Sequence, residues 1–234
     1  MSENRCVNKI SAFPRVNARM LLLILLIPLF TSCGTAKEIF CAYDTFNFHA
    51  VKEGVLYRSA QPSAADLRLV VRDYSIQSVI NLRGAQIGQS WYDIEKRVSD
   101  ELRLQRVDIA MSAARLPHRE DLILLLDAFR VLPRPILIHC KAGADRTGEA
   151  AAIFAIDHLG WSREDALRQL RPYYGHVCKL TPAKKYFIRE VYQGEDWARN
   201  TFDPCKQDYE YYDKAECNVD VKARRYSPEV DDER

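Results

Sequence analysis

The fold is decided by residues 135–148, which read PILIHCKAGADRTG. A short apolar strand leads into a loop of small residues, and the loop opens a helix. The segment from Cys140 to Arg146, here called the cysteine loop, has five residues between its thiol and its guanidinium. Backbone N–H groups of such a loop, together with the positive end of the following helix, bind anions. The pattern therefore predicts an anion site beside a cysteine.

The residues of the cysteine loop have expected roles in holding a phosphate. The Arg146 guanidinium can bind two phosphate oxygens at once. The same positive surroundings stabilise a Cys140 thiolate, which is a far better nucleophile than the thiol. The residues expected to contact the substrate are Lys141, Ala142, Gly143, Ala144, Asp145 and Thr147, the last with a hydroxyl that can assist the departing sulfur.

The sequence HCKAGADRTG resembles the HCxxGxxR[ST] motif of the cysteine-dependent protein tyrosine and dual-specificity phosphatases, above all their small bacterial members. Two further segments, YRSAQPS at 57–63 and VINLR at 79–83, resemble the bacterial dual-specificity-like enzymes at the equivalent places. The resemblance implies that Cys140 attacks phosphorus, that a phosphocysteine forms and that water releases phosphate. The alternative is a buried cysteine before an ordinary strand-to-helix turn.

Strands and helices alternate along the chain, which predicts an α/β domain with a central, mostly parallel sheet of about four or five strands flanked by helices. We place this domain at residues 46–194 of the 234. Strands are expected at 55–58, 78–82, 104–109 and before the cysteine loop, and helices at 64–74, 90–102, 120–132, 146–159, 162–170 and 182–192. The expected buried stripes are Leu67, Val70 and Val71 in the first helix, and Trp91, Ile94 and Val98 in the second.

The first 33 residues resemble a bacterial signal peptide. A basic segment precedes the apolar run from Met20 to Phe30, which is too short for a membrane span of about 20 residues. The following LFTSCG resembles a lipobox, so Cys33 is the expected lipidation site and 34–45 a linker. We expect an exported, periplasmic protein anchored by lipid to the outer membrane, because Gly34 replaces the aspartate typical of inner-membrane retention. A plain signal peptide or an uncleaved anchor is the alternative.

Cysteine usage agrees with an oxidising compartment. Of the seven cysteines, four are left once the leader, lipidation and nucleophile positions are set aside: Cys41, Cys178, Cys205 and Cys217. Pairing of Cys205 with Cys217 would fasten the C-terminal segment, and pairing of Cys41 with Cys178 would fasten the N-terminal one; four free thiols are the alternative. Residues 195–234 carry twelve acidic and seven basic residues, and we interpret them as a polar extension, partly disordered or held by a disulfide.

The general acid has three candidates, all of them aspartates. Asp108 lies 32 residues before Cys140, a spacing similar to that of the acid in many dual-specificity phosphatases. The loop that follows it, residues 111–117, contains no carboxylate, so Asp121 and Asp145 are competing candidates. The charge of Arg58 suggests a second anion contact or a structural role, and His139 is expected to orient the cysteine loop.

Three classes of function follow from these residues. The first is an exported phosphatase acting on phosphomonoesters, chiefly phosphotyrosine or other phosphoprotein, or alternatively on phospholipids or inositol phosphates, which Lys141 favours and Asp145 disfavours. The second is an inactive phosphate-binding module, and the third a rhodanese-like sulfurtransferase. A net charge of +2 indicates no nucleic-acid partner, and no spacing of residues suggests a metal site or another cofactor.

Overall fold

A five-stranded sheet forms the centre of the molecule. The computed structural model describes residues 46–218, and the strands follow the order β1-β2-β5-β3-β4. Strands β2, β5, β3 and β4 are parallel, and β1 pairs antiparallel with β2 at the edge. Their bounds are β1 His49–Lys52, β2 Leu56–Ser59, β3 Ser78–Asn81, β4 Gln105–Asp108 and β5 Ile136–His139. The predicted, mostly parallel sheet is confirmed; β1 was not predicted.

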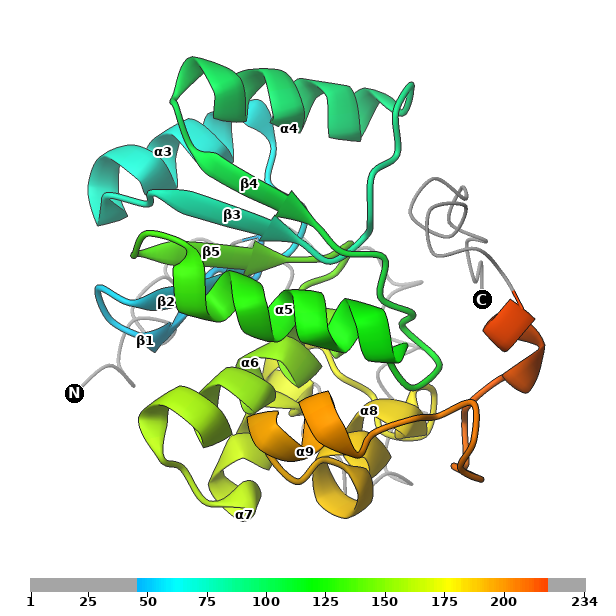
Figure 1. The fold of residues 1–234 in the computed structure, drawn as a ribbon. Helices are drawn as coiled ribbons and strands as arrows, with labels where there is room; N and C mark the ends of the chain where they lie inside the picture. The colour runs from blue at the N-terminus through cyan, green and yellow to red at the C-terminus, as the bar shows by residue number, and fades with distance from the viewer. Residues whose placement is uncertain (1–45, 219–234) are drawn as a thin grey trace, which may run out of the picture.

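Helices cover both faces of the sheet (Figure 1). On one face, α3 (Ala64–Tyr74) and α4 (Ser90–Glu101) pack on Val79 and Leu137. On the other face, Ile80, Ile136 and Ile138 contribute to a larger core with residues from the remaining helices. These helices are α5 Arg119–Val131, α6 Asp145–Leu159, α7 Arg163–Ala166, α8 Pro182–Tyr186 and α9 Glu195–Asn200. Alternate side chains of each strand therefore serve two separate hydrophobic layers.

The helix boundaries agree with the sequence to within two residues up to α6 and diverge after it. The helix predicted at 162–170 is α-helical only to Ala166 and continues as a 3₁₀ turn over Leu167–Gln169; a second 3₁₀ turn spans Pro172–Tyr174. The helix predicted at 182–192 changes at Phe187 into a π turn that ends at Val191.

The buried face of α4 differs from the predicted one. Of the expected stripe, Val98 is buried, whereas Ile94 is 40% exposed and Trp91 is half-buried. Glu95 is buried instead, because it pairs with His139 and Arg106 from two strands of the sheet. A carboxylate with partners inside the protein thus takes a position that a hydrophobic pattern assigns to an apolar residue.

The hydrophobic core continues past residue 194, where the sequence predicts the domain to end. Ala198 and Phe202 are fully buried, and Tyr209 and Tyr212 pack against the same core. Cys205 and Cys217 form a disulfide, which confirms one of the two predicted pairings. The segment after residue 194 is polar in composition, but its few aromatic residues pack into the core and attach it to the domain. A 3₁₀ turn, Lys214–Asn218, closes the described chain.

Several predictions fall outside residues 46–218. These are the signal peptide, lipidation of Cys33, the linker, and the C-terminal residues after 218, as well as the pairing of Cys41 with Cys178. Within the described residues, no helix is long and apolar enough to cross a membrane.

Candidate active site

The cysteine loop lies at the carboxyl ends of the parallel strands. It follows β5, the middle strand, and α6 begins at its Asp145. Ligands bind at this end of open α/β sheets. Cys140 is 2% exposed and Arg146 is 8% exposed, so the predicted nucleophile and phosphate ligand are both brought into a sheltered site.

Three successive carbonyl groups of the cysteine loop accept hydrogen bonds from outside the loop. The backbone N–H of Gln61 donates to the Lys141 carbonyl at 3.1 Å. The Asn47 amide donates to the Ala142 carbonyl at 2.9 Å, and Arg58 Nη2 donates to the Gly143 carbonyl at 2.7 Å.

The fixed carbonyls determine where the neighbouring amides point. In a trans peptide the C=O and the following N–H point in opposite directions. The three carbonyls point to the outer, convex side of the cysteine loop. The N–H groups of Ala142, Gly143 and Ala144 therefore point to its inner, concave side. This is the arrangement that a bound oxyanion requires.

Gly143 is the residue that the cysteine loop needs for steric reasons. Its φ is +70°, in the left-handed region that disfavours side chains. A Cβ at this position would lie 2.6 Å from the backbone of Ser59 and Ala60. The loop thus packs directly against the end of β2, with no space for a methyl group.

The contacts of Arg58 are those of the structural role. Its side chain is fully buried, with Nη1 donating to the backbone carbonyl and to Oε1 of Gln169, each at 2.8 Å. Its guanidinium carbon lies 3.9 Å from the centre of the Tyr174 ring. Burial lowers the pKa of Arg58 to about 10, so it stays a cation at neutral pH.

His139 and Glu95 form a buried pair next to Cys140. His139 Nε2 lies 3.1 Å from Glu95 Oε1, and Arg106 Nε donates to the same oxygen at 3.2 Å. Burial alone would raise the pKa of Glu95, but His139, Arg106 and Gln61 outweigh it and lower the pKa to about 2. Glu95 is therefore an anion that fixes the histidine next to Cys140.

Asp145 faces a neighbouring segment of the chain. Its Oδ1 lies 2.6 Å from His176 Nδ1 and accepts a hydrogen bond of 2.6 Å from the Thr181 hydroxyl. His176 is fully buried. The carboxylate is thus engaged with residues outside the cysteine loop, which limits the repulsion that the sequence suggested for anionic substrates.

Asp108 is held at the end of β4 by three side chains. Asn81 Nδ2 and the Tyr92 hydroxyl donate to it, each at 2.8 Å, and Arg106 forms an ion pair with it at 2.8 Å. The other candidate acid, Asp121, is buried on the first turn of α5.

The loop at 111–118 is held from two sides. Lys184, fully buried, donates to the Arg115 carbonyl at 2.5 Å and to Glu149 Oε2 at 2.8 Å. From the C-terminal segment, the Tyr211 carbonyl accepts from the Leu116 N–H at 3.2 Å. This loop is therefore tied both to α6, which carries Arg146, and to the segment closed by the disulfide.

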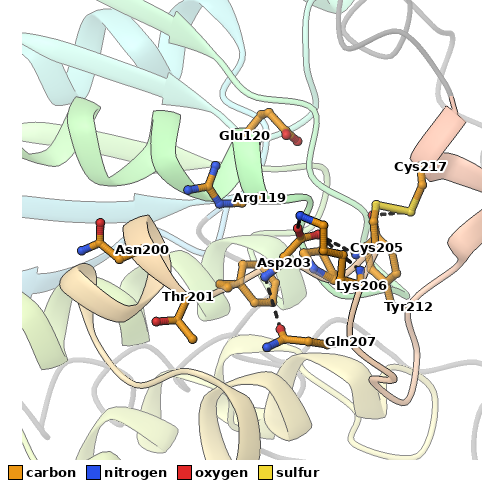
Figure 2. Close-up of a pocket in the computed structure, with 12 residues that line it drawn as sticks. Arg119, Glu120, Asn200, Thr201, Asp203, Cys205, Lys206, Gln207, Tyr212 and Cys217 are labelled. Atoms are coloured by element: carbon orange, nitrogen blue, oxygen red, sulfur yellow. Dashed lines mark hydrogen bonds and ion pairs between the residues drawn. A yellow bond between two sulfur atoms is a disulfide. The ribbon is translucent and has the colours of Figure 1, made fainter.

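A separate cavity of about 510 Å³ lies between the start of α5 and the C-terminal segment (Figure 2). Arg119 and Glu120 line it from α5, and the Cys205–Cys217 disulfide lies at its edge. None of its lining residues belongs to the cysteine loop. The cavity is thus distinct from the candidate active site.

Comparison with known proteins now identifies the family. Residues 40–169, more than half of the chain, match the profile of the Tyrosine phosphatase family. The chain belongs to this family. The match covers β1 to β5, the cysteine loop and the first part of the following helices, and it confirms the resemblance found in the sequence.

Two curated relatives illustrate the similarity. One is the dual specificity protein phosphatase TpbA of Pseudomonas aeruginosa, 30% identical over 138 residues, which are 56% of this chain and 57% of TpbA. The chain thus spans little more than half the length of that relative. The other is the mouse phosphatidylglycerophosphatase and protein-tyrosine phosphatase 1, 22% identical over 62% of this chain and 76% of the relative.

A solved structure shows the same fold. The core catalytic domain of the PP-IP phosphatase SIW14 from S. cerevisiae superimposes with a TM-score of 0.51 at 21% identity. The superposition covers 62% of this chain and 85% of that domain. The predicted fold class is therefore confirmed.

Several residues that hold the site were not predicted. Asn47, Glu95, Glu149, His176 and Lys184 act through contacts with residues far away in the sequence. Of the residues that hold the cysteine loop from outside, only Arg58 could be picked out locally, as a charged residue at the end of an apolar strand.

Proposed function

We propose that this protein hydrolyses phosphomonoesters through a phosphocysteine formed on Cys140. The observation that carries the proposal is the set of three carbonyls held by hydrogen bonds from outside the loop, since each peptide then directs its N–H toward the inside of the loop that begins at Cys140. Arg146 adds a permanent positive charge at the start of α6. A thiolate nucleophile and convergent donors for an oxyanion are the two requirements of this chemistry.

The reaction proceeds in two displacements at phosphorus. Cys140 Sγ forms a bond to phosphorus while the bond to the ester oxygen breaks, and the departing oxygen takes a proton. Water then attacks phosphorus, the S–P bond breaks, and inorganic phosphate and the thiolate are released. The loop residues Lys141, Ala142, Gly143, Ala144 and Asp145 surround the phosphate, and Arg146 binds its oxygens.

Thr147 is suited to assist the second displacement. Its hydroxyl oxygen is buried and makes no hydrogen bond with the residues the structure describes. It is the residue after Arg146, in the first turn of α6. We assign it the role of donating to the sulfur as the thiolate leaves.

Asp108 is the proposed general acid, on the spacing to Cys140. To donate a proton it must release at least one of its contacts with Asn81, Tyr92 and Arg106. The variant Asp108→Asn, compared with Asp145→Asn on an aryl and an alkyl phosphate, tests the assignment. The true acid loses more activity on the alkyl ester, whose leaving group needs the proton. Equal losses on both esters would show that Asp108 serves only to hold β4 and α4 together.

The proposed substrate is a phosphoprotein, chiefly one containing phosphotyrosine. An aryl leaving group departs with little protonation, which suits an acid that is tied up in contacts. The curated relatives, named as a dual specificity phosphatase and a protein-tyrosine phosphatase, support this class. A phospholipid or inositol phosphate is the second candidate, favoured by the exposed Lys141 and by the second name of the mouse relative.

We also propose that the protein acts outside the cytoplasm, in the periplasm, held to the outer membrane by a lipid on Cys33. The leader supports this proposal, as does the Cys205–Cys217 disulfide, because such bonds persist in oxidising compartments. Membrane fractionation of cells producing the full chain or its Cys33→Ser variant tests it. The variant should leave the membrane fraction, and retention of both in the membrane would contradict lipidation.

The activity itself is tested with p-nitrophenyl phosphate and the protein lacking residues 1–33. We expect hydrolysis by the wild type and none by Cys140→Ser. A panel of phosphotyrosine and phosphoserine peptides, phosphoinositides and phosphatidylglycerophosphate then distinguishes the substrate classes. The largest kcat/KM on phosphotyrosine peptides supports the first candidate, and the largest on a lipid supports the second.

A further inference from the structure

Arg58 is a buried cation to which the reaction proposed above assigns no role, yet it donates a hydrogen bond to the centre of the cysteine loop. Nη2 donates to the Gly143 carbonyl, and Nη1 donates twice to Gln169. One planar side chain therefore links the cysteine loop to the 3₁₀ turn at Leu167–Gln169.

The cost of burying this group indicates a specific purpose. A buried charge without compensating contacts is strongly destabilising, whereas an apolar residue of similar size is often neutral or favourable at such a position. Among the described residues, no carboxylate forms an ion pair with Arg58. Its partners are carbonyl oxygens, an amide oxygen and the ring of Tyr174. The Arg58 charge also interacts with Cys140 and Asp145, but its hydrogen bonds all go to neutral oxygens, so the fixed guanidinium fork positions backbone through its geometry.

Asn47 extends the same arrangement to the next peptide. Its Nδ2 donates to the Ala142 carbonyl at 2.9 Å and to the Tyr174 carbonyl at 2.8 Å. Asn47 is 1% exposed. Asn47 and Arg58 thus bind two adjacent carbonyl groups of the cysteine loop, and both are held in turn by Gln169 and Tyr174. We call these four residues the outer clamp.

We infer that Arg58 is a positioning residue of the phosphate site, which holds the Gly143 carbonyl outward so that the Ala144 N–H faces the phosphate. The inference rests on the proposed phosphatase function. Without the Arg58 contact, the Gly143–Ala144 peptide is free to rotate, because Gly143 tolerates many backbone conformations. A rotated peptide would present its carbonyl oxygen to the anion, which repels it.

The experiment compares Arg58→Met and Arg58→Lys with wild type. Arg58→Met retains much of the volume and loses every donor. Arg58→Lys retains the charge but cannot reach Gly143 and Gln169 at once. It tests the same inference if the methionine variant does not fold. The measurements are kcat and KM for p-nitrophenyl phosphate, the inhibition constant of inorganic phosphate, and the thermal midpoint.

Arg163→Met is the matched control. Arg163 also donates with both guanidinium nitrogens to two backbone carbonyls, those of Arg189 and Tyr192, at 2.6 and 2.8 Å. It lies at the start of α7, away from the carboxyl ends of the strands (Figure 1). Its replacement should lower the thermal midpoint but leave kcat and phosphate affinity unchanged.

Both Arg58 variants should lower kcat/KM and weaken phosphate inhibition by about 10- to 100-fold, less than the ~100- to 1,000-fold loss on removing an oxyanion donor itself. Folded Arg58 variants with wild-type phosphate inhibition and kcat/KM would overturn the inference while leaving the phosphatase function intact. A wild-type protein that hydrolyses no ester and binds no phosphate would instead overturn the proposed function, and the inference with it.

Discussion

Nε2 of His139 lies 3.1 Å from the carboxylate of Glu95, and both side chains are completely inside the protein. One residue comes from the end of β5 directly before the nucleophile, and the other from the middle of α4. The pair thus connects the cysteine loop to a helix on the opposite side of the sheet from α6. Arg106 shares the same carboxylate oxygen and completes the buried network.

Replacement of Glu95 by glutamine should destabilise the protein in a pH-dependent way. Its pKa of about 2 in the folded protein lies below the ordinary 4.5, so its contribution to stability is present above pH 4.5 and is lost as the pH falls toward 2. We expect Glu95→Gln to lower the free energy of unfolding by about 3 kcal/mol at neutral pH. Urea unfolding should show this difference shrinking below pH 4.5.

Glu101→Gln, on the same helix, is the control for this prediction. Glu101 is exposed and pairs with Arg68 and Arg97 at the surface, so its loss should cost less than about 1 kcal/mol. A Glu95→Gln difference that stays constant from neutral pH to pH 3 would contradict the lowered pKa of Glu95.

Gly143→Ala should abolish activity, whereas Gly88→Ala should not. Both glycines have positive φ, +70° and +90°, so each substitution strains the backbone by about 1–2 kcal/mol. At Gly143 the methyl group also meets immovable backbone of Ser59 and Ala60 at 2.6 Å, while at Gly88 it meets open space. Assays of p-nitrophenyl phosphate hydrolysis and thermal unfolding separate the two effects. Equal behaviour of the two variants would refute the tight fit of the cysteine loop.

Lys184 and Glu149 should be energetically coupled. They are fully buried and 2.8 Å apart, and burial raises the pKa of Glu149 to about 7 even beside Lys184, so removal of either partner leaves a buried ionisable group without its partner. We expect Lys184→Met and Glu149→Leu each to cost about 3–5 kcal/mol. The double variant should cost clearly less than the two together, as a double-mutant cycle by urea unfolding will show. Additive losses would mean that the ion pair contributes nothing as a pair.

The Cys205–Cys217 disulfide should stabilise the loop at 111–118. The bond closes a separation of 12 residues, and Tyr211 within it accepts from the Leu116 N–H. The double variant Cys205→Ser/Cys217→Ser should lose about 3 kcal/mol of stability. Amide exchange at Leu116 should accelerate more than exchange in β5. Unchanged exchange at Leu116 would show that the disulfide does not stabilise the loop.

The sequence predicted those parts of the molecule that depend on near neighbours. The cysteine loop is a strand, a turn and a helix start in one continuous segment, so residue types alone indicated its form. The start of α3 was found because Ser63 is a typical N-cap residue; in the structure its side chain forms a capping box with Asp66.

The parts that were missed depend on distant contacts. A structural role for Arg58 was predicted, but not its partner 85 residues away; Asn47 contacts the cysteine loop across 95 residues, and no local signal indicates this contact. Glu95 looks like a surface residue until His139 and Arg106 are brought beside it. Strand β1 is four residues long at the edge of the sheet and pairs only with β2, so its pattern is weak.

The most direct test of the account is to trap the covalent intermediate. Wild-type protein lacking residues 1–33 is mixed with p-nitrophenyl phosphate, quenched in acid within the first turnover and digested for mass spectrometry. We predict one phosphoryl group on the peptide that contains Cys140, lost on quenching after the substrate is exhausted and absent from Cys140→Ser. Turnover with no adduct on Cys140, or with the phosphoryl group on His139, would contradict the central claim.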